Sequence, residues 1–323
     1  MAAFRTVWLL LALVFFGAIS PAATQSPAAQ PSAQQEPITP VPAAAAQDPR
    51  RVALGEQLFQ DRRLSHDNTR SCSTCHDTRT NGASANARDA TLQGEPLPLN
   101  TLTIFNAALN FRLNWEANVR SLEHQAEQSI NNSVIMGSSI DEILAKLEAD
   151  PETVKRFQDA YARGPGRDNL LDAIAAFERS LITPGSRFDR WLAGDAGAIT
   201  SEELSGYQLF KSLGCISCHQ GVNIGGNLSQ RHGVFVPIGS PKPELVRVPS
   251  LRNVATTAPY FHDGSMATLP EAVKAMGKAQ LDRALTEDQI TGLVAFLKTL
   301  TGAYKGTPLT APNAGALHER AQP

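Results

Sequence analysis

The chain has 323 residues, of which 42% are hydrophobic, 19% charged and 6% aromatic, which excludes a polytopic membrane protein and a wholly disordered chain. At ~150 residues per domain, this length predicts about two domains, each able to bury a core. The 29 Lys and Arg residues nearly balance the 31 Asp and Glu residues, and the sequence has no long basic run. No nucleic acid is therefore expected as a partner.

The beginning of the chain has the pattern of a secretory signal peptide. Arg5 is the single charged residue before the apolar run Val7–Ile19, and the small residues Ala22 and Ala23 follow. This pattern predicts a signal peptide over residues 1–23 and a periplasmic mature protein. The apolar run has 13 residues, fewer than the ~20 needed to cross a bilayer. An uncleaved membrane anchor is the alternative.

Two terminal segments have compositions that do not favour a core. Residues 24–49 are mostly Ala, Pro, Gln and Ser, and residues 305–323 are similar. Because few of these side chains can bury apolar surface, we expect a flexible linker at 24–49 and a flexible tail at 305–323.

An internal repeat lies between these segments. Gly55-Glu-Gln-Leu-Phe59 has a counterpart in Gly206-Tyr-Gln-Leu-Phe210, and Ala176–Leu181 has one in Ala295–Leu300. Each copy therefore runs from an opening helix, through a pair of cysteines, to a closing helix. The repeat predicts two similar domains, at residues 50–190 and 191–304.

The closing helices carry the clearest secondary-structure signals. Thr286 and Gln289 form a capping-box pattern, and apolar residues then recur at helical spacing. The apolar positions are Ile290, Leu293, Val294, Leu297 and Leu300 in the second copy, and Ile174, Phe177 and Leu181 in the first. Pro and Gly interrupt residues 221–265 repeatedly, and few stretches alternate as strands do. The pattern predicts a mainly α fold with long loops.

All four cysteines lie in two CxxCH blocks, Cys72-Ser-Thr-Cys75-His76 and Cys215-Ile-Ser-Cys218-His219. Two thiols at this spacing can add to the vinyl groups of one haem, and the next His then presents its imidazole to the iron. Four thiolates could also bind zinc, but this reading leaves both histidines unexplained. A thioredoxin-like dithiol would need a βαβ pattern that the sequence lacks. We therefore expect two covalent c-type haems, with His76 and His219 as proximal ligands.

The second axial position of each iron must be filled by another His or Met, or stay open. A Met ligand raises the reduction potential, whereas an open position lets the iron bind peroxide or oxygen. The candidates are His66, His124, His232, His262, His318, Met136, Met266 and Met276.

Taken together, these residues resemble the bacterial dihaem cytochrome c peroxidase family, which includes the MauG-type enzymes. The resemblance covers roughly residues 50–304. The motifs that carry it are Leu54–Phe59, Leu64-Ser65, both CxxCH blocks, Gly221–Asn223, Pro249–Val254, Ala258–Gly264, Met276–Leu281 and Phe296–Leu300. The resemblance implies an oxidoreductase with two cytochrome c-like haem domains.

The resemblance also implies a division of labour between the two haems. The second haem would be a high-potential electron-transfer centre with His219 and Met276 as ligands. The first, with His76 as its proximal ligand, would react with peroxide. Trp115 falls where the family has a tryptophan between the haems, so its indole would help electrons cross; simple interface packing is the alternative.

A calcium ion between the domains is a further implication of the resemblance. Asn100, Thr257 and Pro259 match the family positions, which offer an Asn side chain and main-chain oxygens. Oxygen ligands of this kind suit a hard cation.

Two departures from the family concern the first haem. Members that need reductive activation carry a histidine about where Leu92 lies, and residues 77–123 contain no histidine, so the first iron is expected to be five-coordinate. The family's distal glutamate aligns with Ile135, which cannot move a proton, whereas its partner glutamine is retained as Gln125. His124 is the nearest substitute in sequence, although adjacent polar residues on a helix usually face water.

Three functions are compatible with these residues. The expected one is a peroxidase that reduces hydrogen peroxide with electrons from a small cytochrome c or copper protein. A MauG-like oxidase would instead withdraw electrons from a partner protein or an organic substrate, and a dihaem electron carrier would not turn over peroxide. Because family members are often dimers, a homodimer is also an expectation.

Overall fold

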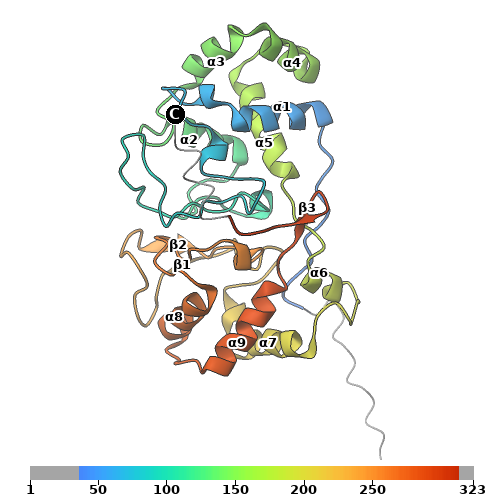
Figure 1. The fold of residues 1–323 in the computed structure, drawn as a ribbon, viewed down its shortest axis with the longest axis vertical. Coiled ribbons are helices and arrows are strands. Elements are labelled where there is room, and N and C mark those ends of the chain that lie inside the picture. The colour runs from blue at the N-terminus through green and yellow to red at the C-terminus, as the bar shows by residue number, and fades with distance from the viewer. Residues whose placement is uncertain (1–35, 313–323) are drawn as a thin grey trace, which may run out of the picture. The chain divides into compact units, whose positions relative to one another are not determined.

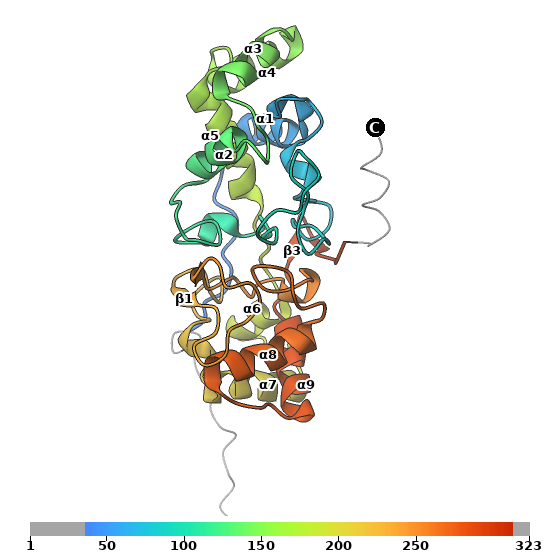
Figure 2. The ribbon, with the colours of Figure 1, turned by 90° about the vertical axis from the view of Figure 1, so that its left-hand side faces the viewer.

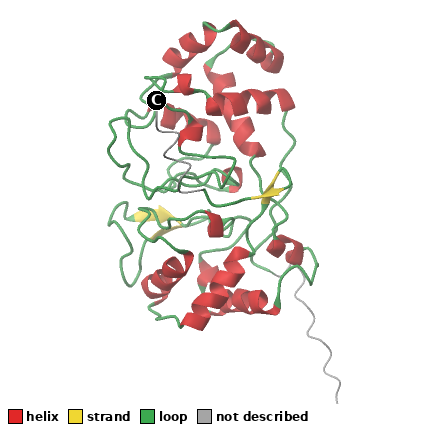
Figure 3. Ribbon diagram, in the orientation of Figure 1, coloured by secondary structure: helices red, strands yellow, loops and turns green. Residues whose placement is uncertain are grey.

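The structure, a computed structural model, describes residues 36–312, which belong to one compact unit. The predicted signal peptide at 1–23 lies outside the described residues. The mainly α fold is confirmed, with short strands and long loops between the helices (Figure 3). The α-helices are α1 (Pro49–Gln60), α2 (Leu122–Asn131), α3 (Ile140–Glu148), α4 (Pro151–Tyr161), α5 (Arg167–Ser180), α6 (Arg187–Leu192), α7 (Ser201–Ser212), α8 (Leu269–Leu281) and α9 (Glu287–Lys298).

Short elements fill the loops. The 3-10 helices are η2 (Arg62–Leu64), η3 (Cys72–Thr74), η4 (Ala107–Leu109), η5 (Cys215–Ser217) and η6 (Val254–Thr256). Strands β1 (Ser229–Arg231) and β2 (Leu245–Arg247) pair antiparallel with Gln230 opposite Val246. Strands β3 (Ala303–Tyr304) and β4 (Thr307–Pro308) form a second antiparallel pair.

Two hydrophobic cores divide the helices into two lobes (Figures 1 and 2). Helices α1 to α5 surround the core of the first lobe, and helices α6 to α9 surround that of the second. The polar side chain of Asn223 joins the lobes, because its amide nitrogen donates to the main-chain oxygen of Asn106 at 3.1 Å. The side chain of Asn253 adds a second link by donating to the hydroxyl of Thr183 at 3.0 Å.

The sequence repeat appears as the same helix crossing in both lobes. Helix α1 crosses α5 at Gly55, where an added β-carbon would overlap the carbonyl group of Ala173. Helix α7 crosses α9 at Gly206, where an added β-carbon would overlap the carbonyl group of Gly292. Each opening helix therefore needs a glycine where its backbone meets the closing helix.

The closing helix α9 begins as its sequence predicts. The hydroxyl of Thr286 accepts a hydrogen bond from the backbone N–H of Gln289, and the side chain of Gln289 accepts one from the backbone N–H of Thr286. This reciprocal pair satisfies two of the N–H groups left free at a helix start. The predicted apolar stripe, Ile290, Leu293, Val294 and Leu297, is buried in the core of the second lobe.

The predicted flexible linker at 24–49 is wrong over its described part. Ile38 is fully buried in the core of the second lobe, and Val41 is also buried. The carboxylate of Glu36 accepts hydrogen bonds from the Tyr207 hydroxyl and the Lys211 amine. Two apolar side chains and one carboxylate anchor this extended segment, although its overall composition is that of a linker.

The predicted limits of the second domain and of the C-terminal tail also need correction. Phe188 and Trp191 of α6 pack in the core of the second lobe, so this lobe begins before residue 191. In the predicted tail, residues 307–308 form β4, and Leu309 is buried in the core of the first lobe. Residue-by-residue composition does not reveal such contacts because they depend on the fold.

No helix among residues 36–312 has the length and apolar character needed to cross a membrane.

Candidate functional site

The first CxxCH block forms a tight turn at η3, next to the core of the first lobe. The Nδ1 atom of His76 lies 3.1 Å from the carbonyl oxygen of Gly82. This bond orients the ring and leaves Nε2 as the atom available to a metal. Burial lowers the pKa of His76, which favours the neutral imidazole that a metal requires, and raises the pKa of the Cys72 and Cys75 thiols to about 12.

The second block repeats this geometry at η5. The Nδ1 atom of His219 lies 3.2 Å from the carbonyl oxygen of Ile224. The rings of Phe210 and His219 are 6.4 Å apart at 52°, the same values as for Phe59 and His76. Burial lowers the pKa of His219 to about 4 and raises that of Cys215 to about 11. Both histidines are thus held neutral in matching positions.

The two blocks do not combine into one metal site. Cys72 packs on the core of the first lobe and Cys215 on that of the second. Within residues 36–312, no group of three or more His, Cys, Asp or Glu side chains is arranged to hold a metal ion. This separation rules against the four-thiolate zinc alternative, whereas one haem at each block needs no such convergence.

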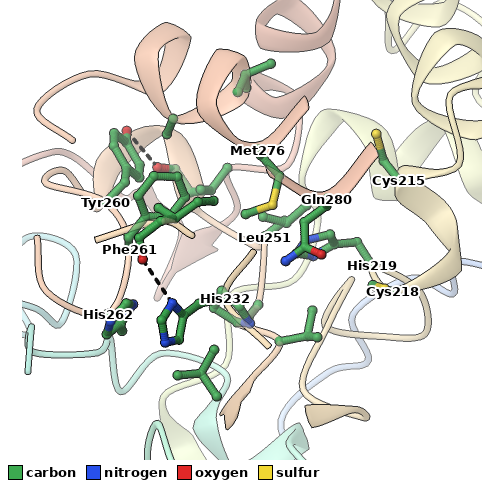
Figure 4. A pocket seen from close by; sticks show the side chains of 18 of the residues that line it. Cys215, Cys218, His219, His232, Leu251, Tyr260, Phe261, His262, Met276 and Gln280 are labelled. Atoms are coloured by element: carbon green, nitrogen blue, oxygen red, sulfur yellow. Dashed lines mark hydrogen bonds between the residues drawn. The ribbon is translucent and has the colours of Figure 1, made fainter. Parts of the chain in front are cut away.

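A cavity of about 460 Å³ lies beside the second block (Figure 4). Cys215, Cys218 and His219 line it, as does Met276 from α8. The thioether of Met276 and the imidazole of His219 point into the same space. The structure therefore brings together the two residues expected as axial ligands of the second haem.

The other methionine candidates lie elsewhere. Met136 is buried in the core of the first lobe, and Met266 packs on that of the second without lining the cavity. His66 is on the surface, 3.1 Å from the carboxylate of Glu142. His318 lies outside the described residues.

Two further histidines line the cavity of the second haem block. The rings of His232 and His262 have centroids 4.5 Å apart and are tilted by 35°. The Nδ1 atom of His232 lies 3.0 Å from the carbonyl oxygen of Ile238, and Nε2 of His262 lies 2.9 Å from that of Ser240. Both were sequence candidates for an axial position, but only the structure shows that they share this cavity.

Trp115 occupies the wall of this cavity. Its indole N–H donates to the main-chain oxygen of Asn100 at 2.8 Å, and its ring meets that of His262 edge-on at 6.3 Å. The backbone N–H of Arg247 donates to the carbonyl oxygen of Trp115 at 2.6 Å. These contacts hold the indole in one orientation between a loop of the first lobe and the cavity of the second.

The lining of this cavity includes the three residues expected to bind calcium. Asn100, Thr257 and Pro259 all line it. The side-chain nitrogen of Asn100 donates to the carbonyl oxygens of Asn86 and Ala87, at 3.3 and 3.0 Å. The amide thus has its nitrogen engaged by the protein, which leaves its oxygen as the atom suited to a hard cation.

The two departures from the family lie in adjoining segments. The backbone N–H of Leu92 donates to the carbonyl oxygen of Val134 at 2.9 Å. Ile135 is half-buried against the core of the first lobe. Positions 92 and 135 are therefore neighbours in space, and both are occupied by apolar residues.

His124 lies on the exposed face of α2. Its side chain is exposed, and its ring is hydrogen-bonded to Gln128 one turn further along α2. Gln125, half-buried, donates to the hydroxyl of Ser129 on the same helix. The imidazole of His124 therefore lies on a solvated helix face, which is the alternative that its polar sequence neighbours also favour.

Arg247 is a residue that the sequence reasoning missed. It is 4% exposed and lines the cavity, and its Nη1 atom has no hydrogen-bond partner among residues 36–312. Burial lowers its pKa to about 10. A buried cation without an anionic partner is costly, and a haem brings two propionate carboxylates. The cavity therefore fits a haem, with Arg247 as a partner for a propionate; the basic residue within the apolar run Val246–Val248 was the available signal.

Comparison with known proteins agrees with this geometry. The model of the family described as "Di-haem cytochrome c peroxidase" matches residues 49–197, and the model described as "Cytochrome c" matches residues 204–301. A solved structure described as a MauG-like protein associated with microbial copper homeostasis superposes with a TM-score of 0.71 at 26% identity, covering 86% of this chain and 95% of the other.

Curated relatives point the same way. The chain is 38% identical to the cytochrome c551 peroxidase of Nitrosomonas europaea, over 84% of this chain and 85% of the relative. It is 39% identical to the cytochrome c peroxidase Ccp of Escherichia coli, over 85% of this chain and 63% of the relative, so it spans just under two thirds of that protein. The chain belongs to the dihaem cytochrome c peroxidase family and is an oxidoreductase of that class.

Proposed function

We propose that this chain is a periplasmic dihaem peroxidase that reduces hydrogen peroxide with electrons from a small cytochrome c or copper protein. The observation that carries the proposal is the pair of matching CxxCH sites, of which the second shares its cavity with Met276. The signal-peptide pattern at residues 1–23 supports export to the periplasm.

The residues that would hold the two haems follow from the site geometry. Cys72 and Cys75 would attach the first, and Cys215 and Cys218 the second. His76 and His219 would ligate the irons through Nε2, since their Nδ1 atoms already face the carbonyl oxygens of Gly82 and Ile224. When bound, a c-type haem supplies an iron that changes oxidation state, and an iron with an open axial position can bind peroxide.

Met276 would separate the roles of the two sites. A thioether ligand favours reduced iron and raises the potential, so the second site would accept electrons from the donor protein. At the first site, Leu92 stands where family members that need activation carry a histidine. An apolar side chain cannot ligate iron, so the first site would keep a position open for peroxide.

Trp115 would support electron transfer between the two sites. Its indole contacts Asn100 and His262, its main chain is held by the backbone N–H of Arg247, and it lines the cavity of the second site. Asn100, Thr257 and Pro259 would bind calcium next to it. A bound ion at Asn100 would keep the indole N–H and its acceptor in place.

A MauG-like oxidase is the second candidate, favoured by the isoleucine at position 135. Without a proton-transfer group there, O–O bond cleavage would be slow, and oxidising equivalents would last long enough to be used on another molecule. The likeness to the MauG-like solved structure agrees with this candidate.

Steady-state turnover distinguishes these functions. The purified dihaem protein is mixed with peroxide and either a reduced small cytochrome c or a reduced copper protein, and donor oxidation is followed. The peroxidase predicts sustained turnover that consumes two donor molecules per peroxide. Peroxide consumption without donor oxidation would contradict it and favour the oxidase, and no peroxide consumption would favour the electron carrier.

A further inference from the structure

The first lobe contains a buried acid, Glu178, that none of the roles proposed above uses. Glu178 lies on α5 and is 5% exposed, within a helix whose other buried residues are mostly apolar. Its Oε2 atom has no hydrogen-bond partner within the described part of the chain. Burying an unpartnered carboxyl is costly, so its retention in a core is unusual unless it serves a function.

The internal repeat shows where Glu178 lies relative to the first CxxCH block. Phe177 follows the α1–α5 crossing at Gly55, and Phe296 follows the α7–α9 crossing at Gly206 in the same way. Glu178 is therefore the counterpart of Leu297, which lines the cavity of the second haem block. By this correspondence, the carboxyl of Glu178 would border the first haem.

The electrostatic surroundings of Glu178 agree with this position. Burial raises the pKa of the Cys72 thiol in η3, and the negative charge of Glu178 raises it further. Burial, together with the charge of Glu123 from α2, raises the pKa of Glu178 to about 8, while Arg179 on its own helix opposes the rise. The side chain of Arg179 is itself paired with Glu123.

Asp89, another buried carboxylate near this block, differs from Glu178 in its hydrogen bonds. Its oxygens accept hydrogen bonds from Ser84 at 2.7 Å, Asn86 at 2.9 Å and the hydroxyl of Thr101. Those donors hold the carboxylate in place. The free oxygen of Glu178, by contrast, is able to exchange a proton.

We propose that Glu178 is the proton-exchanging group of the first haem site and supplies the acid–base function that Ile135 and His124 do not. This inference rests on the proposed peroxidase function. In the reaction, one peroxide, two protons and two electrons give two waters. Glu178 accepts the proton of one peroxide oxygen and returns it to the other as the O–O bond breaks, so it is regenerated. Both protons consumed in the reaction come from solvent, and the electrons come from the small redox protein.

The most direct test measures the midpoint potentials of both haems as a function of pH. A carboxyl beside the first haem with a pKa near 8 couples reduction to proton uptake, so the potential of that haem falls as the pH rises through about 8. The second haem is the internal control, because Leu297 stands at the corresponding place. Glu178→Gln should remove the pH dependence of the first haem and leave the second unchanged.

A matched variant tests how the charge of Glu123 affects the pKa of Glu178. Glu123→Gln removes the negative charge that raises the pKa of Glu178, so the transition should remain but move to lower pH. Glu178→Leu copies the residue of the second lobe, and its unchanged far-UV circular dichroism would show that the fold does not need the carboxyl.

The rate of peroxide turnover is a second measurement that tests the role of Glu178. Glu178→Gln and Glu178→Leu should lower kcat with peroxide by ~10²–10⁴-fold, the usual contribution of a positioned acid–base group. A first-haem potential that shows no pH dependence, or variants that keep wild-type kcat, would overturn the role of Glu178. Absence of turnover in the wild-type protein would instead overturn the proposed peroxidase function, while the potential measurement would still report on Glu178.

Discussion

Met276→His should lower the midpoint potential of the second haem by a large fraction of the ~0.8 V range that axial ligands span, on the order of hundreds of millivolts. Imidazole stabilises oxidised iron better than a thioether does, and Met276 shares its cavity with His219. Spectroelectrochemical titration of the purified protein measures both potentials. Because the donor protein would then reduce the second haem less readily, peroxide turnover should also fall.

Met266→Leu is the matched control for this change. Met266 packs on the core of the second lobe but does not line the cavity, so its replacement should leave both potentials unchanged. Two unchanged midpoint potentials in Met276→His would show that Met276 is not a ligand. His232 would then be the next residue to replace, because it lines the same cavity.

Arg252→Met should destabilise the fold by about 3–5 kcal/mol, the usual cost of leaving a buried charge without its partner. The Arg252 and Asp189 side chains are 1% and 4% exposed and lie 2.8 Å apart. Arg252 also donates to the carbonyl oxygens of Val222, after the second CxxCH block, and Thr39. Its loss therefore leaves the buried carboxylate of Asp189 without a counter-charge and removes the side-chain hydrogen bonds to both loops. Urea unfolding followed by far-UV circular dichroism measures the change.

Two controls separate burial from charge in this prediction. Arg190 lies on the same helix as Asp189 and pairs with Asp195, which follows that helix; the two side chains are 54% and 52% exposed. Arg190→Met removes this exposed pair and should cost about 0–1 kcal/mol. The double variant Arg252→Met with Asp189→Leu removes both buried charges and should recover much of the loss. If Arg252→Met costs no more than Arg190→Met, the buried pair does not hold these segments together.

The features predictable from sequence are those encoded by neighbouring residues. The capping pair of Thr286 and Gln289 lies within one helical turn, and so does each CxxCH block. The glycine at the helix crossing could also be expected, because Gly55 and Gly206 occupy the same place in the repeat. In each case the residues that determine the local structure lie within one short segment of the sequence.

The features missed depend on contacts between distant segments. Ile38 and Val41 look like part of a linker because only two apolar residues anchor that stretch to the second lobe. Arg247 is recognisable as a buried cation only once β2 is placed beside the cavity. Glu178 reads as a polar residue of an amphipathic helix until the packing of α5 buries it. His124, in contrast, is exposed on α2, as adjacent polar residues on a helix usually are.

Haem content of the mature protein tests the central claim most directly. Intact-protein mass spectrometry under denaturing conditions, with a pyridine haemochrome assay, counts the haems that stay attached to the chain. Two CxxCH blocks predict the added mass of two haems, and Cys215→Ala together with Cys218→Ala should leave one, at the first lobe. A chain that carries one haem or none, or whose haem is removed by acidic acetone, would contradict the account.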